Sequence, residues 1–276
     1  MRIVVLSSSL YSETACATAS HLAGLGCIPP GALSLGTLDL TMLRRKLAQW
    51  GPHQFTSYAR MKLWPQNRSE APTIHNPHLE RYLRRDGRIF RNLKEVGRFY
   101  GFPVATCADQ NSSTSLAQLR RWSPDLIIFA GGNILRKPLL QLPRRGVINM
   151  HLGLLPQIRG MNSPEWSLLT RVPPGITIHY IDAGIDTGAI LKKYEYPDAM
   201  RCQTLTELRQ RLVAFAIEKL GEVVGELDRE AVLPTPQIDN NSGRGPDRQF
   251  FVMHDWLRGR AKECLANNRD DRQNPE

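Results

Sequence analysis

The chain lacks the features that mark several common classes of protein. No apolar run approaches the roughly 20 residues of a membrane span, and the N-terminal run from Ile3 to Leu6 is shorter than the core of a signal peptide. The few cysteines form no CxxC pair and no metal-ligand spacing: Cys16, Cys27, Cys107, Cys202 and Cys264. An odd, scattered set argues against a disulfide framework and favours a reducing compartment. We therefore expect a cytoplasmic protein with no membrane partner and no metal site.

A dinucleotide fingerprint and an excess of acidic residues are also missing. Gly131-Gly132 is not part of a G-x-G-x-x-G sequence, so it does not indicate a dinucleotide site. Lys and Arg number 36 against 26 Asp and Glu, which gives a net charge of +10 and a pI of about 9.7. A basic surface favours an anionic partner, such as nucleic acid, a nucleotide-linked substrate or a polyglutamated cofactor. The alternative is a basic protein without an anionic partner, because net charge alone is weak evidence of function.

The order of the apolar segments indicates an α/β fold. Strands are expected at residues 2–9, 102–109 and 125–130, and in the segments that begin GVINMH and GITIHYI. Helical periodicity between them predicts helices at 14–25, 38–62, 78–100, 115–122, 163–170 and 204–226. This alternation predicts a mostly parallel twisted sheet flanked by helices. Thr204 and Glu207 fit a capping box at the start of the last helix.

The composition changes after that long helix. Residues 1–226 are expected to form one α/β domain, and residues 227–266 a short C-terminal extension that includes a short strand or helix in QFFVMHDWL. Residues 267–276 are polar and charged, and we expect them to form a frayed tail.

Three polar side chains suit the chemistry of addition to a carbonyl. Asn149 and His151 lie two apart in an extended strand, so they project together at its end. An amide donor beside an imidazole suits the stabilisation of an oxyanion. Asp186, in a Gly-flanked loop, adds a carboxylate. We expect Gly131-Gly132, Asn149–His151 and Asp182–Asp186 to meet beyond the carboxyl ends of parallel strands.

Each of these residues also has a purely structural interpretation. Asn149 and Asp186 are of types common in turns, and His151 fits a buried polar residue under a loop. His179 lies in the middle of a strand, and we interpret it as structural. The arginines between residues 81 and 91 fit a solvated helix face. Only the joint spacing and order favour a catalytic set.

That joint pattern resembles a known family. Asn149-x-His151, the LLP that follows, the Arg159-Gly160 turn and Asp186 in IDTG are similar to the motif of the 10-formyltetrahydrofolate-dependent formyltransferases. This family includes glycinamide ribonucleotide, methionyl-tRNA and amino-sugar formyltransferases. The resemblance spans about residues 100–195 and implies a Rossmann-like formyltransferase domain over residues 1–226.

The resemblance also implies roles for individual residues. Asn149, His151 and Asp186 would be catalytic, with Asp186 favouring a protonated His151 or taking a proton from the attacking amine. The formyl donor, 10-formyltetrahydrofolate, would be held by two loops: Gly132, Asn133, Ile134, Leu135, Ile181, Asp182, Ala183 and Gly184. One departure is Gly153, where the family usually has serine, so a side-chain hydrogen bond of that pattern is in question here.

The acceptor is left open by the sequence. RGMNSPEW, Arg159 to Trp166, resembles members that act on amino sugars or specialised metabolites, which favours a small-molecule amine, an amino sugar or a nucleotide-linked amine. Methionyl-tRNA is the alternative, although the resemblance implies a β-barrel domain in those members and the last 50 or so residues have few alternating strands. Two further alternatives are hydrolysis of formyl-folate and a catalytically silent folate-binding or scaffold protein. A homodimer is one of the oligomeric states left open.

Overall fold

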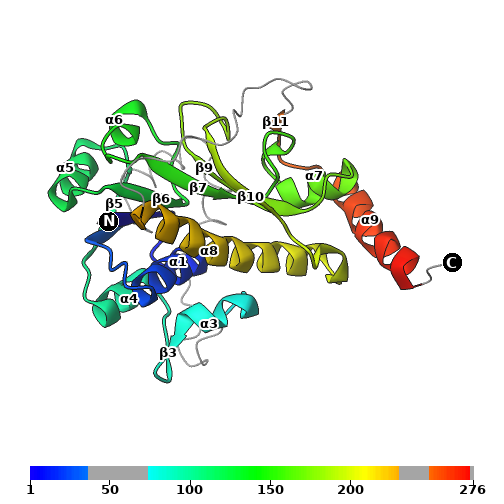
Figure 1. Ribbon diagram of the computed structural model, residues 1–276, viewed down its shortest axis with the longest axis horizontal. Helices are drawn as coiled ribbons and strands as arrows, with labels where there is room; N and C mark the ends of the chain where they lie inside the picture. Colours follow the sequence, from blue (N-terminus) through cyan, green and yellow to red (C-terminus); the bar gives the residue numbers. More distant parts are fainter. Residues whose placement is uncertain (37–73, 230–248, 274–276) are drawn as a thin grey trace, which may run out of the picture.

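A seven-stranded sheet forms the centre of the molecule (Figure 1). The computed structural model describes residues 1–36, 74–229 and 249–273. The strand order is β10-β9-β7-β6-β1-β2-β5. These strands are β1 (Ile3–Ser7), β2 (Gly31–Leu35), β5 (Val104–Cys107), β6 (Leu126–Ala130), β7 (Val147–His151), β9 (Gly175–Tyr180) and β10 (Ile190–Glu195).

The sheet is parallel from β5 through β7, as the alternation of strands and helices predicts. Strand β9 runs antiparallel to both β7 and β10. The expectation that Asp182–Asp186 lies beyond the carboxyl end of a parallel strand is therefore wrong. This loop leaves β9 beside the start of β7, where Ile181 N donates to the carbonyl of Val147 at 2.8 Å. It then folds back, because Asp186 contacts His151 at the other end of β7.

Helices cover both faces of the sheet (Figure 1). The sheet therefore separates two clusters of buried apolar residues, one on each face. Alternate residues of β1 point to opposite faces, so Ile3 and Val5 belong to one cluster and Val4 and Leu6 to the other. The first cluster is packed by α1, α3, α4 and α8, and the second by α5 and α6. The helices are α1 (Glu13–Gly24), α3 (Glu80–Leu83), α4 (Leu93–Tyr100), α5 (Ser113–Trp122), α6 (Lys137–Leu140), α7 (Ser163–Leu169), α8 (Leu205–Arg229) and α9 (Asp255–Gln273), with 3-10 turns η1 (Pro77–Leu79) and η2 (Ala199–Arg201).

Half of the capping box at the start of α8 is confirmed, because Glu207 N donates to Thr204 Oγ1 at 3.0 Å. The Glu207 carboxylate accepts from Gln203 N at 2.7 Å instead of from Thr204 N. One long helix over residues 78–100 is not observed. A hairpin of β3 (Arg84–Arg85) and β4 (Arg88–Ile89) interrupts it. The two residues that join them, Asp86 and Gly87, both have positive φ, at 47° and 74°, which is the geometry that Asp-Gly favours in a two-residue hairpin loop. The expected helix over 38–62 lies outside the described residues.

The C-terminal segment returns to the domain beside α7. Strand β11 (Gln249–Phe250) pairs with β8 (Arg159–Gly160), and Trp166 of α7 stacks on Phe250 with ring centroids 4.6 Å apart. Helix α9 then continues to Gln273, so residues 267–273 are helical. Within the parts of the chain that the structure describes, no helix is long and apolar enough to cross a bilayer.

Candidate active site

Strands β7 and β9 bring four polar side chains together. Asn149 and His151 lie on β7, and the antiparallel register places His179 of β9 directly opposite Asn149. Residues opposite each other in such a pair project from the same face of the sheet. Asp186 reaches the same place from the loop after β9, with its carboxylate 3.4 Å from His151 and 3.6 Å from His179. The amide, imidazole and carboxylate singled out in the sequence therefore meet.

His179 fixes the direction of the Asn149 carboxamide. Its Nδ1 lies 2.8 Å from the carbonyl oxygen of Tyr180, an acceptor, so Nδ1 carries the proton. Its Nε2 then has a free lone pair, which accepts a hydrogen bond from Asn149 Nδ2 at 3.2 Å. One N–H of the carboxamide is used in this bond, and the second N–H of the same nitrogen remains for a ligand. His179 is thus a positioning residue for Asn149.

Burial keeps His179 neutral. Its side chain is almost fully buried, and this burial, with the nearby His151, lowers the pKa of His179 to about 4 although Asp186 acts in the opposite direction. At neutral pH the ring therefore keeps the lone pair that orients Asn149.

His151 is also held on both sides. Its Nε2 donates to the carbonyl oxygen of Ile158 at 2.7 Å, and its Nδ1 faces Asp186. Both ring nitrogens face acceptors, so a proton on each would be satisfied. The hydroxyl of Ser163 donates to Gly160 O at 3.0 Å and lies 3.3 Å from His151 Nε2, so its oxygen adds a second acceptor beside that nitrogen.

This contact explains the departure at Gly153. A Cβ at this position would lie 2.9 Å from His151 Nε2, 2.9 Å from a methyl group of Ile158 and 3.0 Å from the Cβ of Ser163. These approaches are closer than normal carbon contacts, so a side chain at Gly153 has no room. The Ser163 hydroxyl of α7 lies beside the same ring nitrogen of His151.

Asp186 is placed by its backbone and by one amide. It has φ 53°, a conformation uncommon for a residue other than glycine, and such strain is often found at functional sites. Its Oδ2 accepts a hydrogen bond from Gly160 N at 2.9 Å. The carboxylate is therefore held between the β8 backbone and the two imidazoles, while remaining partly open to solvent.

The C-terminal segment supports this placement. Gly160 has φ 93°, and a Cβ there would lie 2.1 Å from the carbonyl oxygen of Phe250 in β11. That carbonyl accepts a hydrogen bond from Met161 N at 2.9 Å. Strand β11 thus packs against the short segment whose amide holds Asp186, which connects the extension to the catalytic set.

The two loops expected to hold the formyl donor flank this set, because β6 and β9 are the neighbours of β7 in the sheet. Gly132 has φ 152°, and a Cβ there would overlap the Gln110 side chain. Gln110 is buried and exchanges two hydrogen bonds with Asn133. Asn133 is thereby committed to the loop itself.

Each of the two loops presents an exposed apolar side chain. Ile134 is 82% exposed and Ile185 is 49% exposed. Leu135 and Ile181, in contrast, pack in or against the core, so only their backbone faces the loop surface. Asp182 accepts hydrogen bonds from Gly184 N and Thr187 Oγ1, which fixes the turn.

From the sequence we interpreted one residue of this site, His179, as structural. His179 does lie in mid-strand as expected, but it also contacts Asn149 and Asp186. Its position opposite Asn149 follows from the register of β7 and β9, which the sequence does not state. Ser163 was assigned only to a helix start. The sequence signal that could have pointed to Ser163 is Gly153. Because Gly153 has no hydroxyl where the family usually has serine, another hydroxyl near His151 could have been sought.

The fold and the candidate site together define a Rossmann-like α/β protein with a cluster of polar side chains on β7 and β9. A family model described as formyl transferase matches residues 79–224, about half of the chain. The chain therefore belongs to the formyl transferase family.

Individual relatives agree with this assignment. The methionyl-tRNA formyltransferase of Trichlorobacter lovleyi is 33% identical over 180 residues, which cover 60% of this chain and 57% of the relative. That of Geobacter metallireducens is 36% identical over 148 residues, covering 50% and 46%. The chain thus spans about half the length of the curated relatives it matches. The solved structure of glycinamide ribonucleotide transformylase 1 from Symbiobacterium toebii matches 81% of this chain and 85% of its own, with a TM-score of 0.52 and 20% identity, which supports the fold.

Proposed function

We propose that this protein is an N-formyltransferase that moves the formyl group of 10-formyltetrahydrofolate to the amine of a small molecule, an amino sugar or a nucleotide-linked amine. The observation that carries the proposal is the contact of Asn149 with His179, which leaves one amide N–H free beside His151 and Asp186. A fixed donor aimed at a developing oxyanion is the largest single contribution in many acyl transfers.

Asn149 and His151 have the electrophilic role. The free N–H of Asn149 donates to the formyl oxygen, and the donation strengthens as that oxygen gains negative charge during attack by the amine. The two ring nitrogens of His151 face Ile158 O and Asp186, so in its doubly protonated form this ring supplies positive charge at the same strand end. Because His179 fixes the amide in advance, little reorganisation accompanies the reaction.

Asp186 has the proton-accepting role. The amine loses a proton once it has bonded to the formyl carbon, and a carboxylate that is partly open to solvent takes it directly or through one water. The hydrogen bond from Gly160 N keeps this carboxylate turned toward the histidines. The proton then returns to the departing nitrogen of the donor.

The residues of the two flanking loops fit the donor. A pterin is flat and carries donors and acceptors along its edge, so it pairs with backbone groups and packs against apolar side chains such as Ile134 and Ile185. The donor supplies an activated formyl carbon when bound, and the loops supply only its orientation.

Methionyl-tRNA is the second candidate acceptor. It is favoured by the names of the relatives and by the net charge of +10. A small amine is supported by the segment RGMNSPEW, Arg159 to Trp166, which resembles members that act on amino sugars or specialised metabolites.

A donor-turnover assay tests the proposal. The full chain is incubated with 10-formyltetrahydrofolate and a panel of amino sugars, nucleotide-linked amino sugars and charged initiator tRNA, and tetrahydrofolate release is measured. Turnover with a small amine that is lost in Asn149→Ala supports the proposal. Turnover with the tRNA alone assigns the second candidate. Formate release without any amine identifies a hydrolase, and an unreactive donor with every acceptor contradicts formyl transfer.

A further inference from the structure

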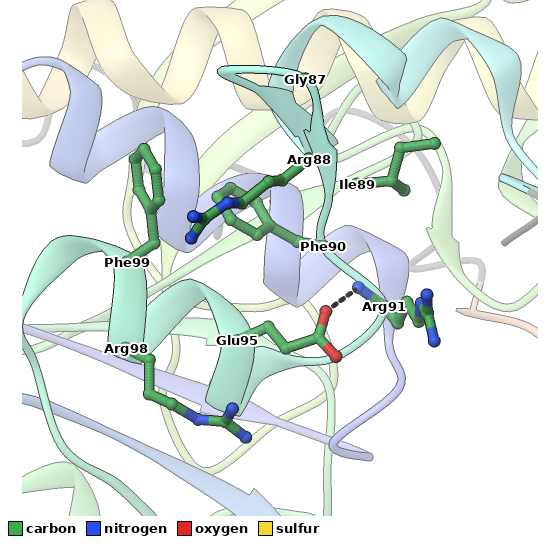
Figure 2. Close-up of a pocket in the computed structure, with 8 residues that line it drawn as sticks. All are labelled: Gly87, Arg88, Ile89, Phe90, Arg91, Glu95, Arg98 and Phe99. Atoms are coloured by element: carbon green, nitrogen blue, oxygen red, sulfur yellow. Dashed lines mark hydrogen bonds between the residues drawn. The ribbon is translucent and has the colours of Figure 1, made fainter.

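A hollow lies against α4 and the β3–β4 hairpin, far along the chain from the catalytic set. It has a cavity volume of about 590 Å³, which is within the usual range for small-molecule sites. Figure 2 shows the side chains that line it: Gly87, Arg88, Ile89, Phe90, Arg91, Glu95, Arg98 and Phe99. We call this feature the arginine hollow.

Aromatic rings supply the apolar part of the arginine hollow. Phe90 and Phe99 meet edge to face with centroids 5.2 Å apart, and Tyr100 packs edge to face on Phe99 at 4.8 Å. These contacts hold both phenylalanines rigidly. Phe90 is buried, but Phe99 keeps part of its surface exposed in the hollow. A planar aromatic ligand gains stabilisation from such a surface.

Cations supply the polar part. Arg88, Arg91 and Arg98 are exposed, and within the described parts of the chain none of their guanidinium groups forms an ion pair. Nearby arginines differ in this respect: Arg84 pairs with Glu80 at 2.7 Å and Arg81 with Glu218 at 2.7 Å.

The single carboxylate of the hollow does not neutralise these three charges. Glu95 accepts a hydrogen bond from Arg91 N at 2.8 Å (Figure 2). It accepts another from the Asn92 amide at 3.2 Å. Asn92 in turn caps α4 through Glu95 N at 3.1 Å. Glu95 is therefore engaged in the start of the helix, and the arginine side chains remain for an anion.

The arginine hollow is separate from the catalytic set. Helix α4 contacts β2 and β5, whereas Asn149 and His179 lie on β7 and β9. Strands β6 and β1 stand between β7 and β2, so three inter-strand steps, or about 14 Å, separate them within the sheet. The ligand of this hollow is thus not the group that reacts.

We propose that the arginine hollow binds a nucleoside diphosphate. The base packs against Phe99, and the phosphates pair with Arg88 and Arg98, with Arg91 at the rim. Guanidinium forks match phosphate oxygens in geometry and charge, and three of them balance the two to three negative charges of a diphosphate. The site is independent of the proposed formyl transfer, since no catalytic residue lines it.

Calorimetric titration of the full chain tests this site, with ADP and UDP as probes at low ionic strength. We expect saturable binding at one site, weakened at least tenfold by Arg98→Ala and several-fold by Phe99→Ala. The matched control is Arg84→Ala, which removes an exposed arginine of the same hairpin that is already paired with Glu80. This control and Asn149→Ala are expected to bind the probes as the unmodified chain does.

Other outcomes overturn the proposal. Absence of binding at millimolar ADP, or binding that Arg98→Ala leaves unchanged, removes the site. Pyrophosphate that binds as tightly as ADP shows that no base is recognised. A short single-stranded RNA that binds much more tightly than either nucleotide identifies a polynucleotide surface instead. Formyl transfer measured without nucleotide remains a separate test of the catalytic set.

Discussion

The candidate catalytic set on β7 and β9 differs from the arginine hollow at α4 in whether its polar side chains have partners within the protein. Around Asn149, each side chain has a partner from another element: His179 across the strand pair, Ile158 O on His151 and Gly160 N on Asp186. In the arginine hollow, Arg88 lies on β4 and Arg98 on α4. In the described residues no carboxylate forms an ion pair with their guanidinium groups.

The paired groups around Asn149 are preorganised for a reaction, whereas the unpaired arginines are suited to recognition of an anion. Groups that act on a transition state need to be fixed before the substrate arrives, because reorganisation during the reaction costs free energy. Groups that capture an anion gain most when no internal partner competes for them. Substitutions in the first region should therefore change turnover or folding, and substitutions in the second should change binding.

The largest expected effect comes from removing the oxyanion donor. Asn149→Ala should lower kcat by about 10²–10³, the usual loss for one such donor, with a far smaller change in KM. Steady-state kinetics with the best amine measure it, and Arg84→Ala serves as a control outside both regions. An Asn149→Ala enzyme with normal kcat would show that the amide does not act in the transition state.

The proximity of these site residues was among the features that could be predicted from the sequence. Asn149, His151 and Asp186 were found because strand spacing places two of them together and the loop motif adds the third. The mostly parallel sheet followed from alternating strands and helices. These features depend on local pattern, which a single sequence contains.

Features that depend on pairing across the sheet were not found. The antiparallel direction of β9 sets both the fold-back of the Asp186 loop and the contact of His179 with Asn149, and neither is visible in the order of strands. The hairpin at Asp86-Gly87 was locally visible, but the surrounding helical periodicity was given more weight. Helical periodicity there came from η1, α3 and α4, which share one buried face.

A smaller effect is expected where the extension meets the catalytic set. Gly160→Ala places a Cβ against the carbonyl of Phe250 and requires φ 93° from alanine, so it should lower the free energy of unfolding by about 1–3 kcal/mol or more. It should also displace the amide that holds Asp186 and reduce kcat. Chemical denaturation and kinetics measure both.

The control for Gly160→Ala is Gly225→Ala in α8, where a Cβ meets nothing within 4 Å. Alanine is favoured over glycine inside a helix, so this variant should be stabilised by about 0.5–1 kcal/mol. Equal stability of the two variants would contradict the packing of β11 against β8.

The neutral state of His179 predicts a dependence of stability on pH. Above pH 6.5, its ordinary pKa, neither folded nor unfolded chain binds the proton. Between pH 6.5 and about 4 the unfolded chain binds it and the folded chain does not, so stability falls as the pH falls, by at most about 3 kcal/mol. Denaturation across this range measures the slope, and His179→Asn should reduce it while His151 and Asp186 remain in both proteins.

Activity should follow the same titration. A protonated His179 cannot accept from Asn149 Nδ2, so the carboxamide would turn its oxygen toward the ring and lose the donor aimed at the substrate. We expect kcat to decline on the acid side in the unmodified chain. A pH profile of kcat that His179→Asn leaves unchanged would contradict the positioning role.

The smallest effect concerns the Ser163 hydroxyl beside His151. Ser163→Ala removes an acceptor beside His151 Nε2 but leaves Ile158 O in place, so kcat should fall only several-fold, in line with about 1 kcal/mol for one hydrogen bond. Gly153→Ser should be more harmful to stability, because its side chain would meet His151, Ile158 and Ser163.

Combining Gly153→Ser with Ser163→Gly tests whether positions 153 and 163 share the space beside His151. With Ser163→Gly, the Cβ that obstructs position 153 from α7 is gone, so Gly153→Ser should cost less free energy of unfolding than it does alone. Its hydroxyl should also recover part of the lost kcat by reaching the same ring nitrogen. Strictly additive effects on both quantities would mean that the two positions do not share this space, and the hydroxyl of Ser163 would then serve only the Gly160 carbonyl.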